Sequence, residues 1–202
     1  TSHPRDMTEE LMRAHRDIEK LQPYLHLPVQ SGSDKILKEM NRNYSSQEYI
    51  EIIDKTREYK QDIAISGDFI VGFPGETDDD FEATLDIVKR VKYAHAYSFK
   101  YSPRPGTPAA LKDDQIDEEI KSERLKTLQD LIRQQTRDFN SSFFEKEINV
   151  LIEKQGLGVN RLTGRSSYLQ SVHMDGDPSF IGEIVKAKII KTRDNSLEGI
   201  IL

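Results

Sequence analysis

The chain has 202 residues, of which 36% are hydrophobic and 32% are charged, and its formal net charge is −6. This length accommodates one large domain or two small ones. No apolar run approaches the ~20 residues that a membrane span needs, and the first residues lack the apolar segment of a signal peptide. The acidic total does not exclude RNA binding, because residues 147–202 hold seven Lys or Arg against seven Asp or Glu and can carry a local basic face.

The sequence contains no cysteine. This excludes disulfides, zinc–thiolate sites, iron–sulfur ligation and a cysteine nucleophile within this chain. The five histidines show no metal-ligand spacing, so no metal site is predicted; His26 and His95 fall in expected strands, as core or site-lining residues. An absence of cysteine suits a reducing compartment, and we expect a cytoplasmic protein with no membrane partner.

Strand-like and helical patterns alternate over the first part of the chain. Strands are predicted at residues 24–29, 63–73 and 94–101, and helices follow them with candidate caps at Asp34, Ser45 and Thr77. This alternation is typical of parallel βαβ units. A long helix is then predicted at about residues 115–145, opening after Asp113 and Asp114.

The pattern changes near Glu147. Short strands are predicted at residues 148–153, 168–172, 181–192 and 197–202, separated by glycine-rich turns. Short strands without a long helix indicate a small β-barrel. We therefore predict an α/β domain over residues 1–143 and an all-β domain over residues 144–202.

Each predicted parallel strand ends in a loop rich in Gly or Pro, where parallel folds bind ligands. In the first loop, Gly32 allows close backbone approach to a ligand, while Gln30, Ser31 and Ser33 offer polar partners for a ribose or a carboxylate. The alternative is a plain strand-to-helix turn capped by Ser33 or Asp34. The motif alone leaves both interpretations open.

The second loop, residues 72–77, is more specific. Gly72 and Gly75 leave the backbone open to a base edge, and Phe73 can pack on a flat base, although an ordinary turn capped by Thr77 is the alternative. The third loop, residues 101–107, presents an aromatic ring and a guanidinium, which suit stacking and phosphate contact. Alone, it is better interpreted as a proline-stiffened linker.

Four runs, residues 25–34, 40–45, 68–77 and 101–109, together resemble the methylthiotransferase branch of the radical S-adenosylmethionine enzymes, in the family's order and spacing. The resemblance covers essentially the whole chain. It implies the C-terminal portion of a partial parallel βα barrel, followed by a TRAM domain, a small RNA-binding β-barrel, over residues 144–202.

The resemblance also implies a function. Residues 27–33 are similar to the members of this branch that methylthiolate isopentenylated adenosine next to the anticodon of tRNA, using S-adenosylmethionine and two [4Fe-4S] clusters. A relative acting on threonylcarbamoyladenosine, and a non-catalytic RNA-binding module, remain alternatives. The family's cluster cysteines are absent, so we expect the chain alone to be inactive, to lack the N-terminal half of the enzyme and to bind the cofactor weakly.

By resemblance, three groups of residues carry binding roles, and none is catalytic or a metal ligand. The tRNA anticodon stem-loop is the expected partner. The residues expected to line the S-adenosylmethionine site are Gln30, Ser31, Ser33, Arg42, Ile70, Gly72 and Phe73. Those expected to face the RNA substrate are Tyr101 and Arg104, and in the all-β domain Arg161, Arg165, Lys188, Lys191 and Arg193. A partial barrel should also expose a sheet edge and apolar surface.

Overall fold

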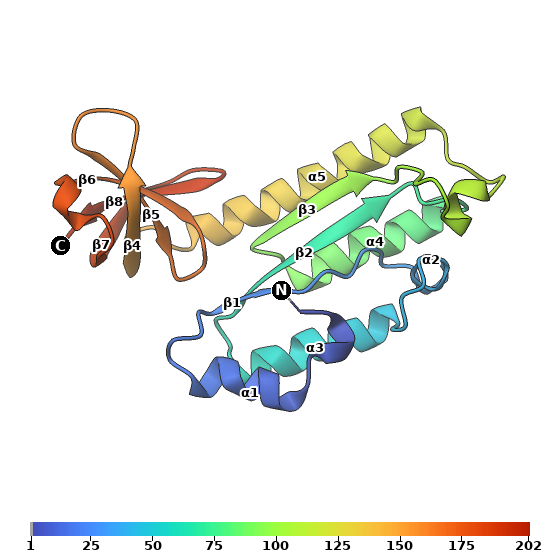
Figure 1. Cartoon of the computed structure of the whole chain (residues 1–202), viewed down its shortest axis with the longest axis horizontal. Helices are drawn as coiled ribbons and strands as arrows, with labels where there is room; N and C mark the ends of the chain where they lie inside the picture. Colours follow the sequence, from blue (N-terminus) through green and yellow to red (C-terminus); the bar gives the residue numbers. More distant parts are fainter. Residues whose placement is uncertain (1) are drawn as a thin grey trace. The chain divides into compact units, whose positions relative to one another are not determined.

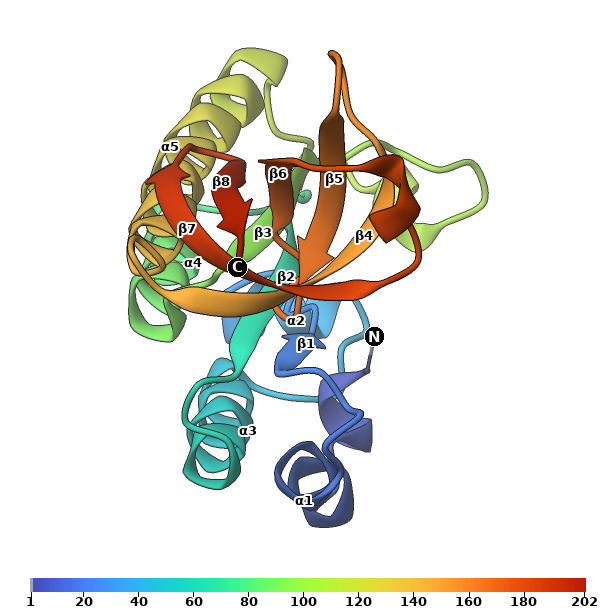
Figure 2. The same cartoon turned by 90° about the vertical axis from the view of Figure 1, so that its left-hand side faces the viewer.

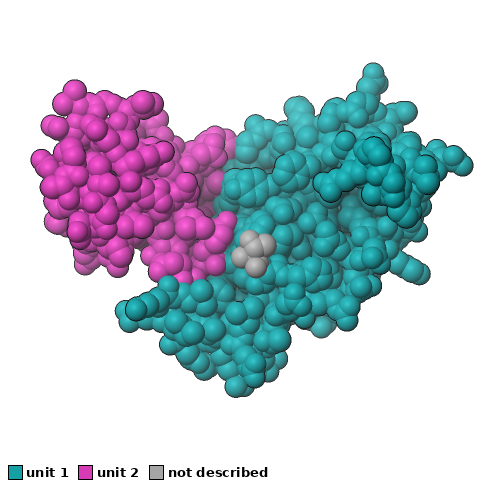
Figure 3. Space-filling view, in the orientation of Figure 1, with its two compact units in different colours: residues 1–21, 25–133 teal, residues 22–24, 134–202 magenta. Residues whose placement is uncertain are grey.

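A computed structural model describes residues 2–202, which form two compact units (Figure 3). Unit 1 comprises the chain up to Leu21 and Leu25–Arg133, and unit 2 comprises Gln22–Tyr24 and Gln134–Leu202. No helix among the described residues is long and apolar enough to cross a membrane.

Unit 1 is built on a three-stranded sheet in the order β1-β2-β3 (Figure 1). The strands are β1 (Tyr24–His26), β2 (Ala64–Val71) and β3 (His95–Lys100). β2 and β3 run parallel, and an isolated parallel bridge between Gln30 and Phe69 continues the pairing beyond β1. The predicted mixed α/β fold with a parallel sheet is confirmed.

The sheet is connected by helices whose caps follow from sequence. Ser33, rather than Asp34, caps α2, while Ser45 with Glu48 and Thr77 with Asp80 form the capping boxes of α3 and α4. The helices are α1 (Glu9–Asp17), α2 (Asp34–Glu39), α3 (Ser46–Tyr59), α4 (Asp78–Val91) and α5 (Glu118–Ser141), with 3-10 turns at η1 (Pro4–Asp6), η2 (Pro108–Leu111) and η3 (Pro178–Phe180).

Two helical expectations need correction. The nine-residue α1, capped by Thr8, was not predicted, because only Leu11 and Met12 mark its apolar side. The long helix begins at Glu118 and ends at Ser141, inside the predicted limits. It does not open at Asp114, because the Asp114 carbonyl oxygen accepts a hydrogen bond from the Gly75 amide instead of starting the helix.

The two faces of the sheet differ. Alternate residues such as Leu27, Phe69 and Val71 are fully buried in the core with apolar residues of α3, α4 and α5. The opposite face carries His26, Ser66, Asp68, Ile70, His95, Tyr97 and Phe99. Of these, Tyr97 and Phe99 remain 52% and 54% exposed, so we call this side the uncovered face.

Unit 2 contains a closed five-stranded barrel in the order β4-β5-β6-β8-β7 (Figure 2). Its strands are β4 (Glu147–Gln155), β5 (Arg161–Ser166), β6 (Ser171–Asp175), β7 (Ile184–Thr192) and β8 (Ser196–Ile201). The predicted all-β architecture is confirmed, but β5 was missed because Arg, Thr and Gly interrupt its apolar pattern. The strand expected from Ile181 starts later because η3 precedes it.

The last turn of α5 packs with this barrel inside unit 2. Phe139, Phe143 and Tyr168 make edge-to-face ring contacts with centroids 5.2–5.8 Å apart. The Asn140 side-chain amide donates to the carbonyl oxygens of Arg193 and Asp194, at 3.0 Å each. The end of the helix therefore belongs to the core of unit 2.

Candidate functional site

Asp80 joins the first two loops at the carboxyl edge of the sheet. Its carboxylate accepts hydrogen bonds from the Ser33 hydroxyl (2.6 Å), the Lys35 ammonium (2.9 Å) and the Thr77 amide (2.9 Å). Partial burial opposes its ionisation, but these donors together hold the pKa of Asp80 well below its usual value. Asp80, the third residue of α4, thus fixes the loop that precedes α2.

Gln30 sits at this edge in a strained conformation. Its φ is +78°, which is uncommon for a residue with a side chain. The backbone amide of Gln30 donates to the Asp68 carbonyl oxygen at 3.0 Å, and the Gln30 carbonyl oxygen accepts from the Ile70 amide at 2.9 Å. These two backbone hydrogen bonds hold Gln30 in this conformation. Gln30 is 8% exposed, and its side-chain amide forms no hydrogen bond with any residue that the structure describes but still reaches solvent. Strain with an unused polar group is typical of a ligand-binding position.

Ser31, Gly32 and Ser33 are explained by packing against α4. The Thr84 hydroxyl accepts from the Gly32 amide at 2.9 Å and lies 3.3 Å from the Ser31 hydroxyl. A Cβ at Gly32 would overlap the Ala83 carbonyl oxygen. The glycine expected to admit a ligand instead admits a helix, and the two serine hydroxyls already have protein partners.

The second loop is held by a buried ion pair. Glu76 accepts from the Gly72 amide at 2.7 Å and from the Arg124 guanidinium at 2.9 Å. The two charged side chains are 0% and 8% exposed. Burial raises the pKa of Glu76, while the Gly72 amide and Arg124 oppose that rise. The pair fixes Gly72 at φ +72° beside the end of β2.

The third loop meets the second through aromatic rings. Phe73, which is 5% exposed, packs edge-to-face on Tyr101 with ring centroids 5.1 Å apart. The Lys121 ammonium lies 5.8 Å from the centre of the Tyr101 ring. The Tyr101 hydroxyl is buried without a hydrogen-bond partner among residues 2–202. Ile70 lies on the adjoining uncovered face and is half-buried.

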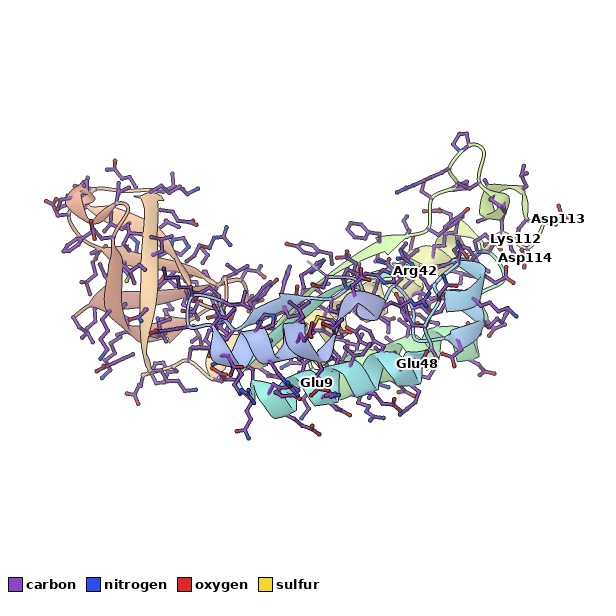
Figure 4. The ribbon with its side chains drawn as sticks, turned by 60° about the horizontal axis from the view of Figure 1, so that its bottom comes forward. Glu9, Arg42, Glu48, Lys112, Asp113 and Asp114 are labelled. Carbon is purple, nitrogen blue, oxygen red and sulfur yellow. The ribbon has the colours of Figure 1, made fainter. Side chains whose placement is uncertain are left out.

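Two predicted cations at this end of unit 1 remain available. Arg42, in the turn after α2, and the exposed Arg104 make no side-chain hydrogen bond or ion pair within the described chain. Figure 4 places Arg42 in that turn and groups Lys112, Asp113 and Asp114 near the end of α2. Lys112 pairs with Glu39 at 2.9 Å, so it is already neutralised.

The uncovered face brings His26 and His95, predicted to be core or site-lining residues, together with Ser66, Asp68 and Tyr97, which the sequence did not single out. His26 lies 2.6 Å from the Ser66 hydroxyl through Nδ1 and 3.4 Å from the Asp68 carboxylate through Nε2. The Tyr97 ring packs edge-to-face on His26 and His95. Burial and the neighbouring His26 lower the pKa of His95. The signal available beforehand was the period-two placement of polar residues in both strands.

The cations predicted in unit 2 separate into two groups. Arg193 pairs with Glu198, Arg161 pairs with Asp175 at 2.9 Å, and Arg165 lies 3.4 Å from Glu153. Lys188 and Lys191 on β7 make no hydrogen bond or ion pair with any described residue. Among the cations predicted in unit 2, these two lysines lack a direct ion-pair partner within the described chain, although Glu147 and Glu198 lie opposite them in the strand register.

Iron–sulfur clusters do not fit the residues present, because the chain has no cysteine to supply thiolate ligands. Among residues 2–202, no group of three His, Asp or Glu side chains could hold a metal ion. S-adenosylmethionine fits better, since the edge combines an unused amide at Gln30, left-handed backbone at Gly72 and the Phe73–Tyr101 ring pair.

Comparisons with known proteins agree with this architecture. Residues 1–88 match the Radical SAM superfamily and residues 145–202 match the TRAM domain. Proteins named tRNA-2-methylthio-N(6)-dimethylallyladenosine synthase are 57% identical over 199 residues in Maricaulis maris (strain MCS10) and 56% identical over 197 residues in Agrobacterium fabrum (strain C58). The matches cover 98% of this chain but only 44% and 43% of those relatives.

A solved structure shares the fold. Coproporphyrinogen III oxidase from Escherichia coli, described as a radical SAM enzyme, superposes with a TM-score of 0.55 at 18% identity, over 99% of this chain and 50% of that one. The chain spans less than half the length of the curated relatives that it matches. Residues 1–88 are thus similar to the radical SAM superfamily and residues 145–202 to the TRAM domain.

Proposed function

We propose that this chain is part of a tRNA methylthiotransferase that acts on dimethylallyladenosine next to the anticodon. The 56–57% identity to proteins named for that substrate supports the proposal. The complete protein would use S-adenosylmethionine and two [4Fe-4S] clusters, whose ligands come from outside this sequence. In this proposal, the radical SAM region ends at residue 143 and the RNA-binding domain begins at residue 144.

In this proposal, unit 1 supplies one wall of the cofactor site. When bound, S-adenosylmethionine supplies a methyl group and radical chemistry. The side-chain amide of Gln30 would hydrogen-bond the cofactor, Ile70 and Gly72 would line its adenine, and Phe73 with Tyr101 would close the apolar side. Arg42 binds its carboxylate. Ser31 and Ser33 act by holding Gln30 in place through Thr84 and Asp80.

Unit 2 would bind the tRNA anticodon stem-loop. Lys188 and Lys191 are ready for phosphate contacts, whereas Arg161, Arg165 and Arg193 must first exchange their carboxylate partners for phosphate. In unit 1, Tyr101 begins the loop after β3 and Arg104 lies exposed in it, where the RNA strand would approach the cofactor.

The strained Gln30 with its unused amide carries the cofactor assignment. We expect Gln30→Ala, in the complete protein, to weaken S-adenosylmethionine binding about tenfold, the effect of losing one hydrogen bond to a charged or polar ligand. Gln47→Ala, an exposed glutamine on α3, is the matched control. Isothermal calorimetry measures both, and equal affinities in the two variants would remove Gln30 from the site.

The overall activity has its own test. The complete protein, prepared without oxygen, is incubated with reductant, S-adenosylmethionine and tRNA that contains dimethylallyladenosine, and the nucleosides are analysed by mass spectrometry. We expect a methylthio group to replace one hydrogen atom of the target adenosine, so that the nucleoside gains the mass of CH2S. The lack of cysteine supports a second candidate for this chain alone, an RNA-binding module, and RNA binding without any turnover by the complete protein would favour it.

A further inference from the structure

The uncovered face of the sheet has an apolar end and a polar end. In the parallel register of β2 and β3, Ile70 lies opposite Phe99 and Asp68 lies opposite Tyr97. The first pair adjoins the edge that carries Gln30, and the second lies one step further along the strands. A ligand entering from that edge would meet hydrocarbon before it met polar groups.

The Tyr97 side chain on this face is exposed but held in place by its neighbours. Tyr97 is 52% exposed, yet its ring packs on His95 with centroids 4.7 Å apart and on His26 at 6.4 Å. His26 is in turn held by Ser66 and Asp68. A ring fixed from behind and open in front loses little conformational entropy when it stacks on a ligand.

The charge on this face restricts what it can bind. Its side chains, as defined above, include no Lys or Arg, and Asp68 is the one acidic group among them. Burying a carboxylate next to Asp68 without a cation would be strongly unfavourable. An uncharged hydrocarbon group meets no such penalty, and it removes the exposed surface of Phe99 and Ile70 from water.

We propose that the uncovered face binds the N6 substituent of the target adenine, with Phe99, Ile70 and Tyr97 in contact with a branched hydrocarbon group. The same face rejects an N6 substituent that ends in a carboxylate, such as threonylcarbamoyl. This inference rests on the proposed function and adds the residues that choose between its two candidate substrates.

The test uses the complete protein and three stem-loop RNAs that carry adenosine, dimethylallyladenosine or threonylcarbamoyladenosine at the target position. Phe99→Ala is expected to raise KM for the dimethylallyl RNA about tenfold, because the hydrocarbon group loses an apolar surface that would shield it from water. The preference of the variant for the dimethylallyl RNA over the unmodified RNA should fall by a similar factor. Cleavage of S-adenosylmethionine without RNA should stay unchanged, which a general folding defect would not allow.

Phe144→Ala is the matched control, because Phe144 has the same 54% exposure but lies in unit 2. Phe99→Lys provides a second, independent variant at an exposed position that tolerates a polar side chain. It should weaken binding of the dimethylallyl RNA and strengthen binding of the threonylcarbamoyl RNA. Unchanged KM values and preferences in either Phe99 variant would overturn the inference.

Different outcomes overturn the proposed function and the role of the uncovered face. If the wild-type protein modifies none of the three RNAs, the proposed function is wrong. If it modifies the dimethylallyl RNA and the Phe99 variants do so equally well, the proposed function stands and another surface reads the substituent. A wild-type preference for the threonylcarbamoyl RNA would overturn the inference about this face directly.

Discussion

At the scale of single residues, we expect the free energy of unfolding to depend strongly on the buried ion pair of Glu76 and Arg124. We expect Arg124→Met to cost about 3–5 kcal/mol, because it leaves the Glu76 carboxylate buried without its partner. Glu76→Gln combined with Arg124→Met should recover much of that loss. Urea unfolding of the three variants measures the coupling, and equal losses in the single and double variants would contradict it.

Gly32 packs so closely on the α4 backbone that there is no room for a Cβ atom. We expect Gly32→Ala to lower the free energy of unfolding by several kcal/mol, on the order of a severe overpacking change, because the new methyl group overlaps the α4 backbone. Gly106→Ala is the control: its φ is +82° but nothing lies within 4 Å, so only the roughly 1 kcal/mol of backbone strain applies. Thermal unfolding distinguishes a steric cause from a backbone one.

At the scale of elements, Asp80 couples the start of α4 to the loop before α2. Its folded-state pKa is depressed, so its ionised form contributes stability above the usual value of 3.8, and that contribution is lost as pH falls through the lower folded value. Asp80→Asn should cost about 1–2 kcal/mol at neutral pH.

The difference between wild type and Asp80→Asn should shrink in increasingly acidic solution. Asp86→Asn, a change to an exposed carboxylate on the same helix, serves as the control and should have little effect. Urea unfolding at neutral and at strongly acidic pH checks the sign. A gap that widened on acidification would mean that Asp80 does not act as the ionised acceptor.

The elements also show what sequence can and cannot predict. Capping boxes at Ser45 and Thr77 were predictable because they depend on residues three positions apart. The strand β5 and the helix α1 were not, because tertiary packing rather than local pattern stabilises them. The loop contacts of Gly32 and Arg124 join residues about fifty positions apart, so no local pattern could have separated ligand binding from packing there.

At the scale of the whole molecule, RNA affinity depends less on the net charge than on which individual cations lack an ion-pair partner. We expect tRNA affinity to fall as salt rises. Lys188→Ala with Lys191→Ala should reduce the slope of log affinity against log salt by about 2, one unit for each lost phosphate contact. Lys186→Ala is the control because Lys186 pairs with Glu147 at 2.9 Å; equal slopes in both variants would exclude this surface.

The strained backbone at Gln30 has a consequence for how this position tolerates change. Folding alone favours glycine there, because glycine adopts a positive φ without steric cost. Glutamine at that place therefore carries a backbone cost that glycine would avoid. A library of variants selected only for resistance to heat should accept glycine at position 30, whereas one selected for cofactor-dependent turnover should reject it, so the two selections would diverge at this single codon.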